Sequence, residues 1–391
     1  MGEKTPVGII GASGYVGAEL MRLLAGHPKF DLRFVTAHTQ ADNAVVGLYP
    51  HLGSFIAEQF PNIGDAAGDH WFEEYSPDLL DDEGLVFLAL PHGASQEIVA
   101  DILSSGTKVV DLAADFRLTD PAQYEKWYGE PHKAPDLLDK FVYGLPELFK
   151  EQLTEQTAAV AVPGCYPTAA ALALAPLIRG GWIQEDGSSK SLIQSEGIIV
   201  DAASGVSGAG RPPKDHTTFC AVDENFSAYG LLNHRHTPEI EQAVGGQVLF
   251  TPHLAPMNRG ILATCYARPA QGLQTADFSR EQLDTAGVSF KDNPVPSDEW
   301  DFGRALTDRL HYFYKGNPFV RVSLELPSTK DTLGSNAAHL TARYDDRTNT
   351  VVVLCAIDNL GKGAAGQAIQ CANLICGLEE AEGLTAVGVY P

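Results

Sequence analysis

The chain opens with a short apolar strand, a glycine-rich turn and an amphipathic helix. The apolar residues 7–10 lead directly into residues 11–17, which carry three glycines at the spacing G-x-x-G-x-x-G. Residues 16–24 have apolar positions at helical spacing. Such a turn leaves bare backbone N–H groups at a helix start, where they bind phosphate. The segment therefore predicts a dinucleotide-binding parallel sheet, with a plain strand-to-helix turn as the alternative.

The end of the second apolar run distinguishes NAD from NADP. NAD sites place an acid there to hold the ribose 2′-hydroxyl, and a carboxylate would repel a 2′-phosphate. Residues 36–40, at the end of the run 32–36, contain no acid, which favours NADP (NADPH). No Arg stands there either, so the group that contacts the 2′-phosphate is open. The predicted cofactor-binding residues of this region are Gly11, Ser13, Gly14, Tyr15, Val16, Gly17, His38 and Thr39.

The pattern of apolar runs divides the chain in two. Up to residue 112, short runs alternate with helical segments, which is typical of a doubly wound α/β fold whose parallel sheet is buried on both faces. After residue 163 the runs lengthen and irregular segments separate them, which predicts a mixed sheet. Small and apolar residues at helical spacing over 361–378 predict a closing helix that returns to the first domain. The predicted strands are 7–10, 32–36, 85–90, 108–112, 191–200, 248–256, 261–267, 319–326 and 351–357.

Charge and cysteine usage limit the possible partners. The chain has 27 Lys and Arg against 50 Asp and Glu, a net charge of −23. This disfavours nucleic acid and anionic membranes, which attract basic surfaces. The most apolar stretch, residues 168–178, is too short to span a bilayer. The six cysteines show no CxxC spacing, so we expect reduced thiols, no metal site and a cytoplasmic location.

Cys165 is the candidate nucleophile. It follows Gly164 and precedes Pro167, a residue suited to the first turn of a helix, and strong helix formers come next. The positive end of a helix dipole is expected to lower the thiol pKa and favour the thiolate. The other cysteines within apolar patterns are interpreted as core residues, and Cys220 is undecided.

Candidate acid–base and anion-binding groups lie in four further segments. His234 and His236 precede a predicted helix with Thr237 as N-cap, where a neutral imidazole is favoured and can exchange protons. The residues do not decide between the two histidines, and surface histidines are the plain alternative. The predicted substrate-binding residues, which offer guanidinium or hydroxyl groups to an anionic substrate, are Arg117, Ser207, Arg211 and Arg259.

Together these segments resemble the N-acetyl-gamma-glutamyl-phosphate reductase family, over nearly the whole chain. The matching segments are residues 11–17, 90–93, 111–117, 143–147, 163–168, 204–211, 234–240 and 358–367. The family is similar in fold to aspartate-semialdehyde dehydrogenase. The resemblance implies a Rossmann domain over 1–163, completed by the C-terminal helix at 358–391. It also implies a central α+β catalytic and oligomerisation domain over 164–357, and a homodimer or homotetramer.

The resemblance also implies an activity. Cys165 would attack an acyl phosphate and form a thioester, NADPH would reduce it to an aldehyde, and His234 or His236 would move protons. Asn359 is expected near the nicotinamide. The substrate is expected to be N-acetyl-gamma-glutamyl phosphate, as in arginine biosynthesis. The alternatives are a reductase of another acyl phosphate, such as aspartyl or aminoadipyl phosphate, and a non-catalytic nucleotide-sensing protein.

Overall fold

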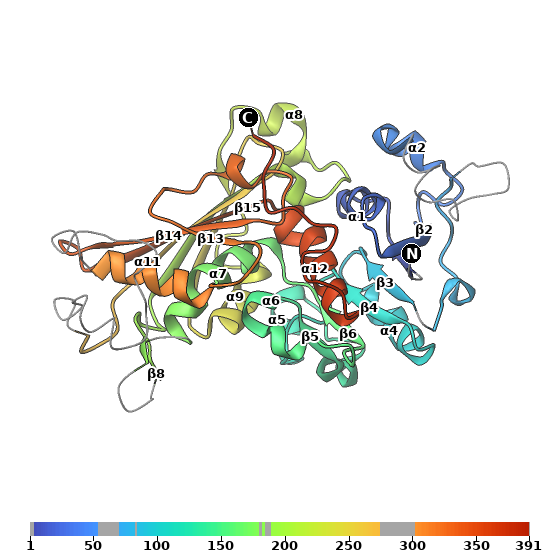
Figure 1. The fold of residues 1–391 in the computed structure, drawn as a ribbon. Helices are drawn as coiled ribbons and strands as arrows, with labels where there is room; N and C mark the ends of the chain where they lie inside the picture. Colours follow the sequence, from blue (N-terminus) through green and yellow to red (C-terminus); the bar gives the residue numbers. More distant parts are fainter. Residues whose placement is uncertain are drawn as a thin grey trace.

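Two large sheets lie on opposite sides of the molecule in Figure 1. The computed structural model describes residues 4–53, 70–82, 84–179, 182–183, 189–273 and 302–390. The first sheet is built from the N-terminal part of the chain, and the second from the central and later parts. None of the described helices is long and apolar enough to cross a membrane.

The first sheet is wholly parallel, with strand order β2-β1-β3-β4-β6-β5. Its strands are β1 (Thr5–Ile10), β2 (Phe30–Thr36), β3 (Leu85–Leu88), β4 (Lys108–Asp111), β5 (Phe141–Tyr143) and β6 (Ala159–Ala161). Helix α1 (Tyr15–Ala25) contributes to the apolar cluster on one face, and α4 (Ser95–Ser104) to the cluster on the other. The predicted doubly wound α/β class is confirmed. The order reverses between β1 and β3, and ligands bind such sheets beyond the strand ends at that point.

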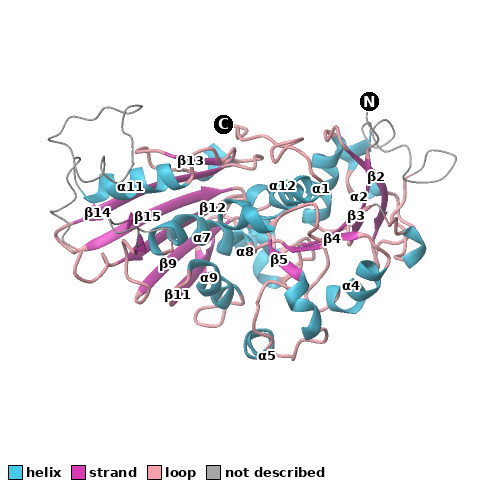
Figure 2. Ribbon diagram, turned by 60° about the horizontal axis from the view of Figure 1, so that its bottom comes forward, coloured by secondary structure: helices cyan, strands magenta, loops and turns pink. Residues whose placement is uncertain are grey.

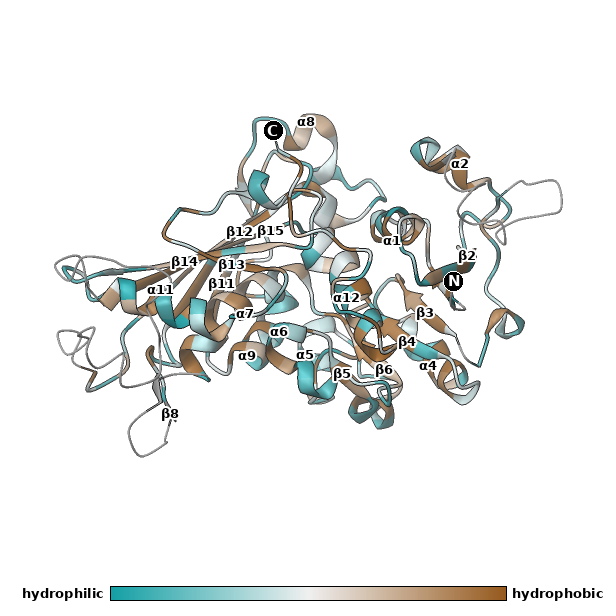
Figure 3. Ribbon diagram, in the orientation of Figure 1, coloured by the Kyte–Doolittle hydropathy of each residue, from teal (hydrophilic) through white to brown (hydrophobic). Residues whose placement is uncertain are grey.

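The second sheet is mixed, with order β10-β11-β9-β12-β15-β14-β13. Its strands are β9 (Ile198–Ser204), β10 (Ser227–Ala228), β11 (Val248–Leu254), β12 (Ile261–Ala267), β13 (Val320–Val322), β14 (Ala338–Asp345) and β15 (Thr350–Ile357). Helices α7 (Cys165–Ile178), α9 (His236–Val244) and α11 (Phe302–Phe313) lie along it in Figure 2 and share its apolar core. The strands are largely brown in Figure 3, and α11 alternates between brown and teal, as expected of a helix covering a sheet.

Helix α7 is buried on every side. Its residues from Tyr166 to Leu177 are all buried, and Pro176 lies inside it near its end. A helix that is apolar all round belongs in the middle of a core. It packs against α9, β12 and β15, so the N-terminus of α7 is held firmly.

The end of the chain returns to the first sheet. Helix α12 (Gly366–Ile375) places Ala368, Ile369 and Ala372 in the same apolar cluster as α1 and β1. In Figure 1 it is the red helix between the two sheets. A π-helical turn over Gly361–Ala365 precedes it and the helix ends at Ile375, so the predicted helix over 361–378 was wrong at both ends.

Three other predicted bounds need correction. The strand predicted over 191–200 begins only at Ile198, because the chain turns at Gly197 with a φ of +67°. The strand predicted over 319–326 is limited to Val320–Val322, where it pairs with β14. The helix predicted to have Thr237 as N-cap begins at His236, with Arg235 in the N-cap position. Apolar content predicted that these segments are buried. It does not show where pairing with a neighbouring strand begins or at which residue a helix starts.

Candidate active site

The three glycines of the first turn have three different roles. Gly11 has a φ of +88°, and a Cβ there would lie 2.7 Å from the carbonyl oxygen of Ala89. A Cβ on Gly17 would lie 2.3 Å from the carbonyl oxygen of Ala12, so that glycine allows helix and turn to pack closely. Gly14, the N-cap of α1, has no described atom within 4 Å of the same position. The turn is therefore closely packed at Gly11 and Gly17 and open at Gly14. A pyrophosphate requires such an opening, because it must approach the backbone N–H groups directly.

The rest of the predicted cofactor segment surrounds this opening. Tyr49 donates its hydroxyl to the carbonyl oxygens of Ser13 (2.8 Å) and Gly14 (3.0 Å) and so fixes the turn. His38 and Thr39 follow β2 and are both exposed. This strand end carries no carboxylate, so the residues present fit a cofactor with a 2′-phosphate.

A cavity of about 760 Å³ lies beside this region. Its lining brings together Cys165, His234, His236 and Arg117, which are far apart in the sequence. The cavity is large enough for a small substrate together with part of a cofactor. The predicted nucleophile, both predicted histidines and one predicted arginine thus share one space.

Cys165 is the first residue of α7, and Gly164 is its N-cap. Burial raises the pKa of the thiol to about 11, while the backbone N–H of Tyr166 and the guanidinium of Arg117 act in the opposite direction. The expectation that the helix start would lower the thiol pKa is therefore wrong. Burial disfavours the charged thiolate by more than the backbone N–H groups and Arg117 favour it.

His236 and Arg117 both contact Gly164, the residue before the cysteine. A Cβ on Gly164 would lie 2.5 Å from Nε2 of His236 and 3.0 Å from Nη1 of Arg117. Both side chains therefore pack directly on this glycine backbone, next to Cys165. On the other side, a Cβ on Gly363 of the π-helical turn would lie 2.8 Å from the Cβ of Cys165. The cysteine is enclosed between two glycines.

The two histidines differ in their contacts. The backbone N–H of His236 donates to Nδ1 of His234 at 3.1 Å, which makes Nδ1 the unprotonated nitrogen of His234. The two rings lie 4.9 Å apart. Burial lowers the pKa of His234 to about 4, with Arg235 adding to the shift. Burial, then His234 and Arg117, hold the pKa of His236 well below its usual value. Both imidazoles are neutral at pH 7.

Glu239 joins these groups, and the sequence analysis gave it no role. Its Oε1 accepts hydrogen bonds from the backbone N–H of Gly164 (2.8 Å) and the hydroxyl of Tyr143 (3.0 Å). Its Oε2 faces Nη1 of Arg117 at 3.5 Å. All these groups are buried or half-buried, so the carboxylate fixes both the backbone before Cys165 and the nearby arginine. Its position three residues after His236, on the same helix face, is the signal that could have identified it.

His92 and Asp115 form a second pair at the cavity that the sequence analysis left without a role. Nδ1 of His92 lies 2.5 Å from Oδ1 of Asp115, a carboxylate that also accepts the backbone N–H groups of Gly93 and Ser95. The neighbouring Asp111 is buried as well. Burial, reinforced by Asp115, raises the pKa of Asp111 to about 7. Burial opposes ionisation of Asp115 too, but the hydrogen bonds from His92 and Gly93 lower its pKa, so Asp111 keeps its proton to a higher pH than Asp115 does.

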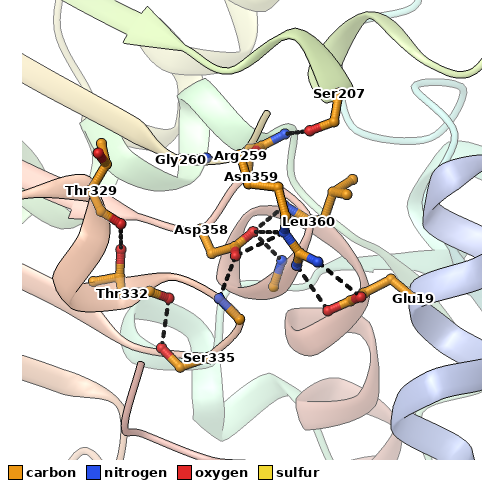
Figure 4. Close-up of polar contacts among 12 residues, drawn as sticks. Glu19, Ser207, Arg259, Gly260, Thr329, Thr332, Ser335, Asp358, Asn359 and Leu360 are labelled. Atoms are coloured by element: carbon orange, nitrogen blue, oxygen red, sulfur yellow. Dashed lines mark hydrogen bonds and ion pairs between the residues drawn. The ribbon is translucent and has the colours of Figure 1, made fainter. Parts of the chain in front are cut away.

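Arg259 does not fit its predicted role in substrate binding. Its guanidinium hydrogen-bonds to both carboxylate oxygens of Glu19 (3.1 and 2.8 Å) and to Asp358, as Figure 4 shows. It is not among the residues that line the cavity. Two carboxylates already neutralise this arginine, so it connects α1 to the second sheet instead of binding an anion.

The remaining predicted residues lie in the loop after β9 and at the end of β15. Asn359 donates from Nδ2 to Oγ of Ser207 at 2.9 Å and accepts the N–H of Gly260 at 2.7 Å (Figure 4). Its side chain thus holds two loops together. Ser207 and Arg211 do not line the cavity, although their neighbours Gly208 and Ala209 do. Arg211 points to the glycine turn instead, where its Nε donates to the carbonyl of Ser13 at 2.7 Å.

Two family models match the chain. "Semialdehyde dehydrogenase, NAD binding domain" matches residues 6–156, and "Semialdehyde dehydrogenase, dimerisation domain" matches residues 165–285 and 298–359. Among solved structures, aspartate semialdehyde dehydrogenase II of Vibrio cholerae, complexed with ASA, has a TM-score of 0.62 at 15% identity and covers 96% of this chain and 98% of that one. The Candida albicans aspartate semialdehyde dehydrogenase with NADP has a TM-score of 0.55 at 14% identity, over 95% and 98%. The fold is that of the semialdehyde dehydrogenase class.

Curated relatives narrow the class. N-acetyl-gamma-glutamyl-phosphate reductases of Desulforudis audaxviator and Symbiobacterium thermophilum are each 43% identical to this chain, over 98% of it and 99% of the relative. That of Heliobacterium modesticaldum is 42% identical over the same shares. The chain belongs to the N-acetyl-gamma-glutamyl-phosphate reductase family.

Proposed function

We propose that this protein uses NADPH to reduce N-acetyl-gamma-glutamyl phosphate to N-acetyl-glutamate 5-semialdehyde and phosphate, a step of arginine biosynthesis. One observation carries the proposal beyond family membership. Cys165 shares a cavity with His236 and Arg117, and both pack on the glycine that precedes it. Such a thiol with a neutral base beside it is suited to attack on an acyl group.

Cys165 and His236 carry the first half of the reaction. As Sγ of Cys165 bonds to the substrate carbonyl carbon, the thiol proton moves to the imidazole of His236. Transfer during attack means that a thiolate of high pKa never accumulates. The guanidinium of Arg117 stabilises the negative charge that develops on the carbonyl oxygen. The carbon–oxygen bond to phosphate then breaks, His236 passes its proton to the leaving phosphate, and a thioester remains on Cys165.

The second half returns the enzyme to its starting state. The glycine turn, with Gly14 open and Tyr49 holding the backbone, would hold NADPH, and the cofactor would provide the hydride that takes the thioester to the aldehyde level. The carbon–sulfur bond breaks, the aldehyde leaves, and Cys165 regains a proton from solvent through His236. Of the four predicted anion-binding residues, Arg117 is kept for the substrate. Arg259 is withdrawn because it is already neutralised, and Ser207 supports the cavity through Asn359.

We further propose an organisation for this activity. Residues 1–163 with 358–391 form the cofactor domain, residues 164–357 form the catalytic domain, and the protein acts in the cytoplasm as a homodimer or homotetramer. The match to a dimerisation model supports the oligomer. So does the sheet face opposite α7, which exposes Ile199, Leu249 and Tyr266. Apolar residues gathered on an open sheet face favour burial against another surface.

The test is the reverse reaction, followed by the absorbance of the NADPH formed. Purified protein is given N-acetyl-glutamate 5-semialdehyde, inorganic phosphate and NADP⁺. Aspartate semialdehyde serves as the competing substrate. Turnover that needs phosphate and is fastest with the N-acetyl-glutamate compound is expected. Turnover only with aspartate semialdehyde would mean that the substrate is an aspartyl compound. A protein that binds the cofactor but turns over neither aldehyde would be a nucleotide sensor.

A further inference from the structure

Arg211 crosses from the catalytic part of the chain to the cofactor turn. Its Nε donates to the carbonyl oxygen of Ser13, 198 residues away in the sequence. Tyr49 donates to the same oxygen. The carbonyl thus fixes the direction of the Arg211 side chain, which is half-buried. The guanidinium is held beside the open space at Gly14, where the cofactor's phosphates are proposed to lie.

No carboxylate of the described residues neutralises the charge of Arg211. Arg259 also reaches α1 from the second sheet, but it pairs with Glu19 and Asp358. Within the described ranges, Arg211 has no carboxylate partner, and its two terminal nitrogens have no hydrogen bond. With Nε used, the remaining N–H groups suit the oxygens of a phosphate. In a chain of net charge −23, a fixed and unpaired guanidinium at a phosphate-binding turn indicates a ligand.

The loop that carries Arg211 is itself fixed. Gly205 and Gly208 line the Cys165 cavity, and Ser207 is bonded to Asn359. Gly210 has a φ of +84°, which turns the chain from the cavity toward the glycine turn. One side of the loop therefore faces Cys165, and Arg211 on the other side points to the glycine turn.

We infer that Arg211 binds a phosphate of the cofactor, either the 2′-phosphate or the pyrophosphate, and not the substrate as the sequence indicated. The inference rests on the proposed use of NADPH. Arg211, which belongs to the catalytic domain, would supply the cation that the end of β2 in the cofactor domain lacks. Cofactor binding would then hold the two domains together and fix the loop that lines the Cys165 cavity.

The experiment compares Arg211→Gln and Arg211→Lys with the wild-type protein. Arg347→Gln is the matched control, because Arg347 is 80% exposed at the turn between β14 and β15. Dissociation constants for NADPH and NADH are measured directly by the fluorescence of the bound nicotinamide. Arg211→Gln should weaken NADPH binding by about tenfold or more, since hydrogen bonds to charged groups are the strong ones. Arg211→Lys should recover part of the loss, and the control should change nothing.

The two cofactors separate the two phosphates. If the Arg211→Gln variant loses affinity for NADPH alone, Arg211 binds the 2′-phosphate. If it loses affinity for NADPH and NADH equally, Arg211 binds the pyrophosphate. Unchanged constants for both cofactors in a variant of normal melting temperature would overturn the inference. So would a rise only in the KM of the semialdehyde substrate. If the wild-type protein itself binds neither cofactor, the proposed function fails instead.

Discussion

The glycine turn and the wall around Cys165 do their work in opposite ways. The turn is one continuous segment, residues 11–17, and it offers backbone N–H groups around an open space. The wall is assembled from Gly164, Arg117, His236, Glu239 and Gly363, and it acts through buried and half-buried side chains packed on glycine backbone. The turn depends on the absence of side chains, and the wall depends on their exact pairing.

This difference predicts different sensitivities to mutation. A change in the turn should alter cofactor affinity or local packing, and it should leave the chemical step intact. A change in the wall should alter the chemical step, because each polar group there is desolvated and holds another.

Replacing Cys165 with Ser should have the largest effect. The hydroxyl keeps nearly the size of the thiol, but it is a far weaker nucleophile, so kcat should fall by on the order of 10³-fold or more. Cofactor affinity should stay within about twofold, because the turn is untouched. Cys220→Ser, at an exposed thiol, is the control. Turnover of Cys165→Ser above a few per cent of wild type in the same assay would exclude the covalent step.

His236→Asn and His234→Asn form a matched pair. Asn keeps a hydrogen-bonding group but cannot carry a proton near neutral pH. Because His236 packs on Gly164, its loss should lower kcat by about 10²–10⁴-fold. His234→Asn should mainly raise KM. Equal losses of kcat in both variants would mean that the two rings act as one unit, and a loss only in His234→Asn would reverse the assignment.

The sequence predicted the turn better than the wall, for a physical reason. Gly11, Gly14 and Gly17 stand within one short segment, so their spacing reports their geometry directly. The position of Cys165 at a helix start was readable in the same way. Its pKa was not, since desolvation depends on residues such as Arg117 and Glu239 that only the tertiary fold brings to it.

The arginines show the same limit. Arg117, Arg211 and Arg259 all stand in plausible anion-binding turns, and sequence alone gave them one role. The fold separates them: Arg117 lies at the cavity, Arg259 is neutralised by two acids, and Arg211 faces the glycine turn. Which acid approaches which arginine is a long-range property that no local spacing encodes.

Gly14→Ala and Gly17→Ala separate the two functions inside the turn. A Cβ on Gly17 would lie 2.3 Å from a backbone carbonyl that cannot move freely, so Gly17→Ala should lose about 1–3 kcal/mol of stability. A Cβ on Gly14 meets no described atom, and the backbone there has an ordinary φ of −87°. Gly14→Ala should therefore keep its stability while cofactor affinity falls about tenfold. Urea unfolding and cofactor titration measure the two effects. Unchanged cofactor affinity in Gly14→Ala would place the pyrophosphate elsewhere.

An acid placed after β2 should weaken NADPH specifically. Ala37 is buried, with 3% of its surface exposed, so an Asp there would also disturb packing; the exposed His38 is the better position. The wild-type protein should prefer NADPH to NADH by about tenfold or more in kcat/KM. His38→Asp should reduce this preference by raising the KM for NADPH. An unchanged ratio would show that the 2′-phosphate does not lie at this strand end.

Asp111→Asn should act on stability alone, and only at higher pH. Burial and Asp115 raise the pKa of Asp111 from 3.8 to about 7 in the folded protein. Between about pH 4 and pH 7 the folded state therefore holds a proton that the unfolded state has released, so stability falls as pH rises through that window. Asn cannot ionise, and its carbonyl can still accept from Ala113 and Ser95. The variant should match wild type at about pH 4 and melt at a higher temperature at about pH 8. Asp136→Asn, an exposed acid, is the control, and an equal difference at both pH values would mean that Asp111 is ionised throughout.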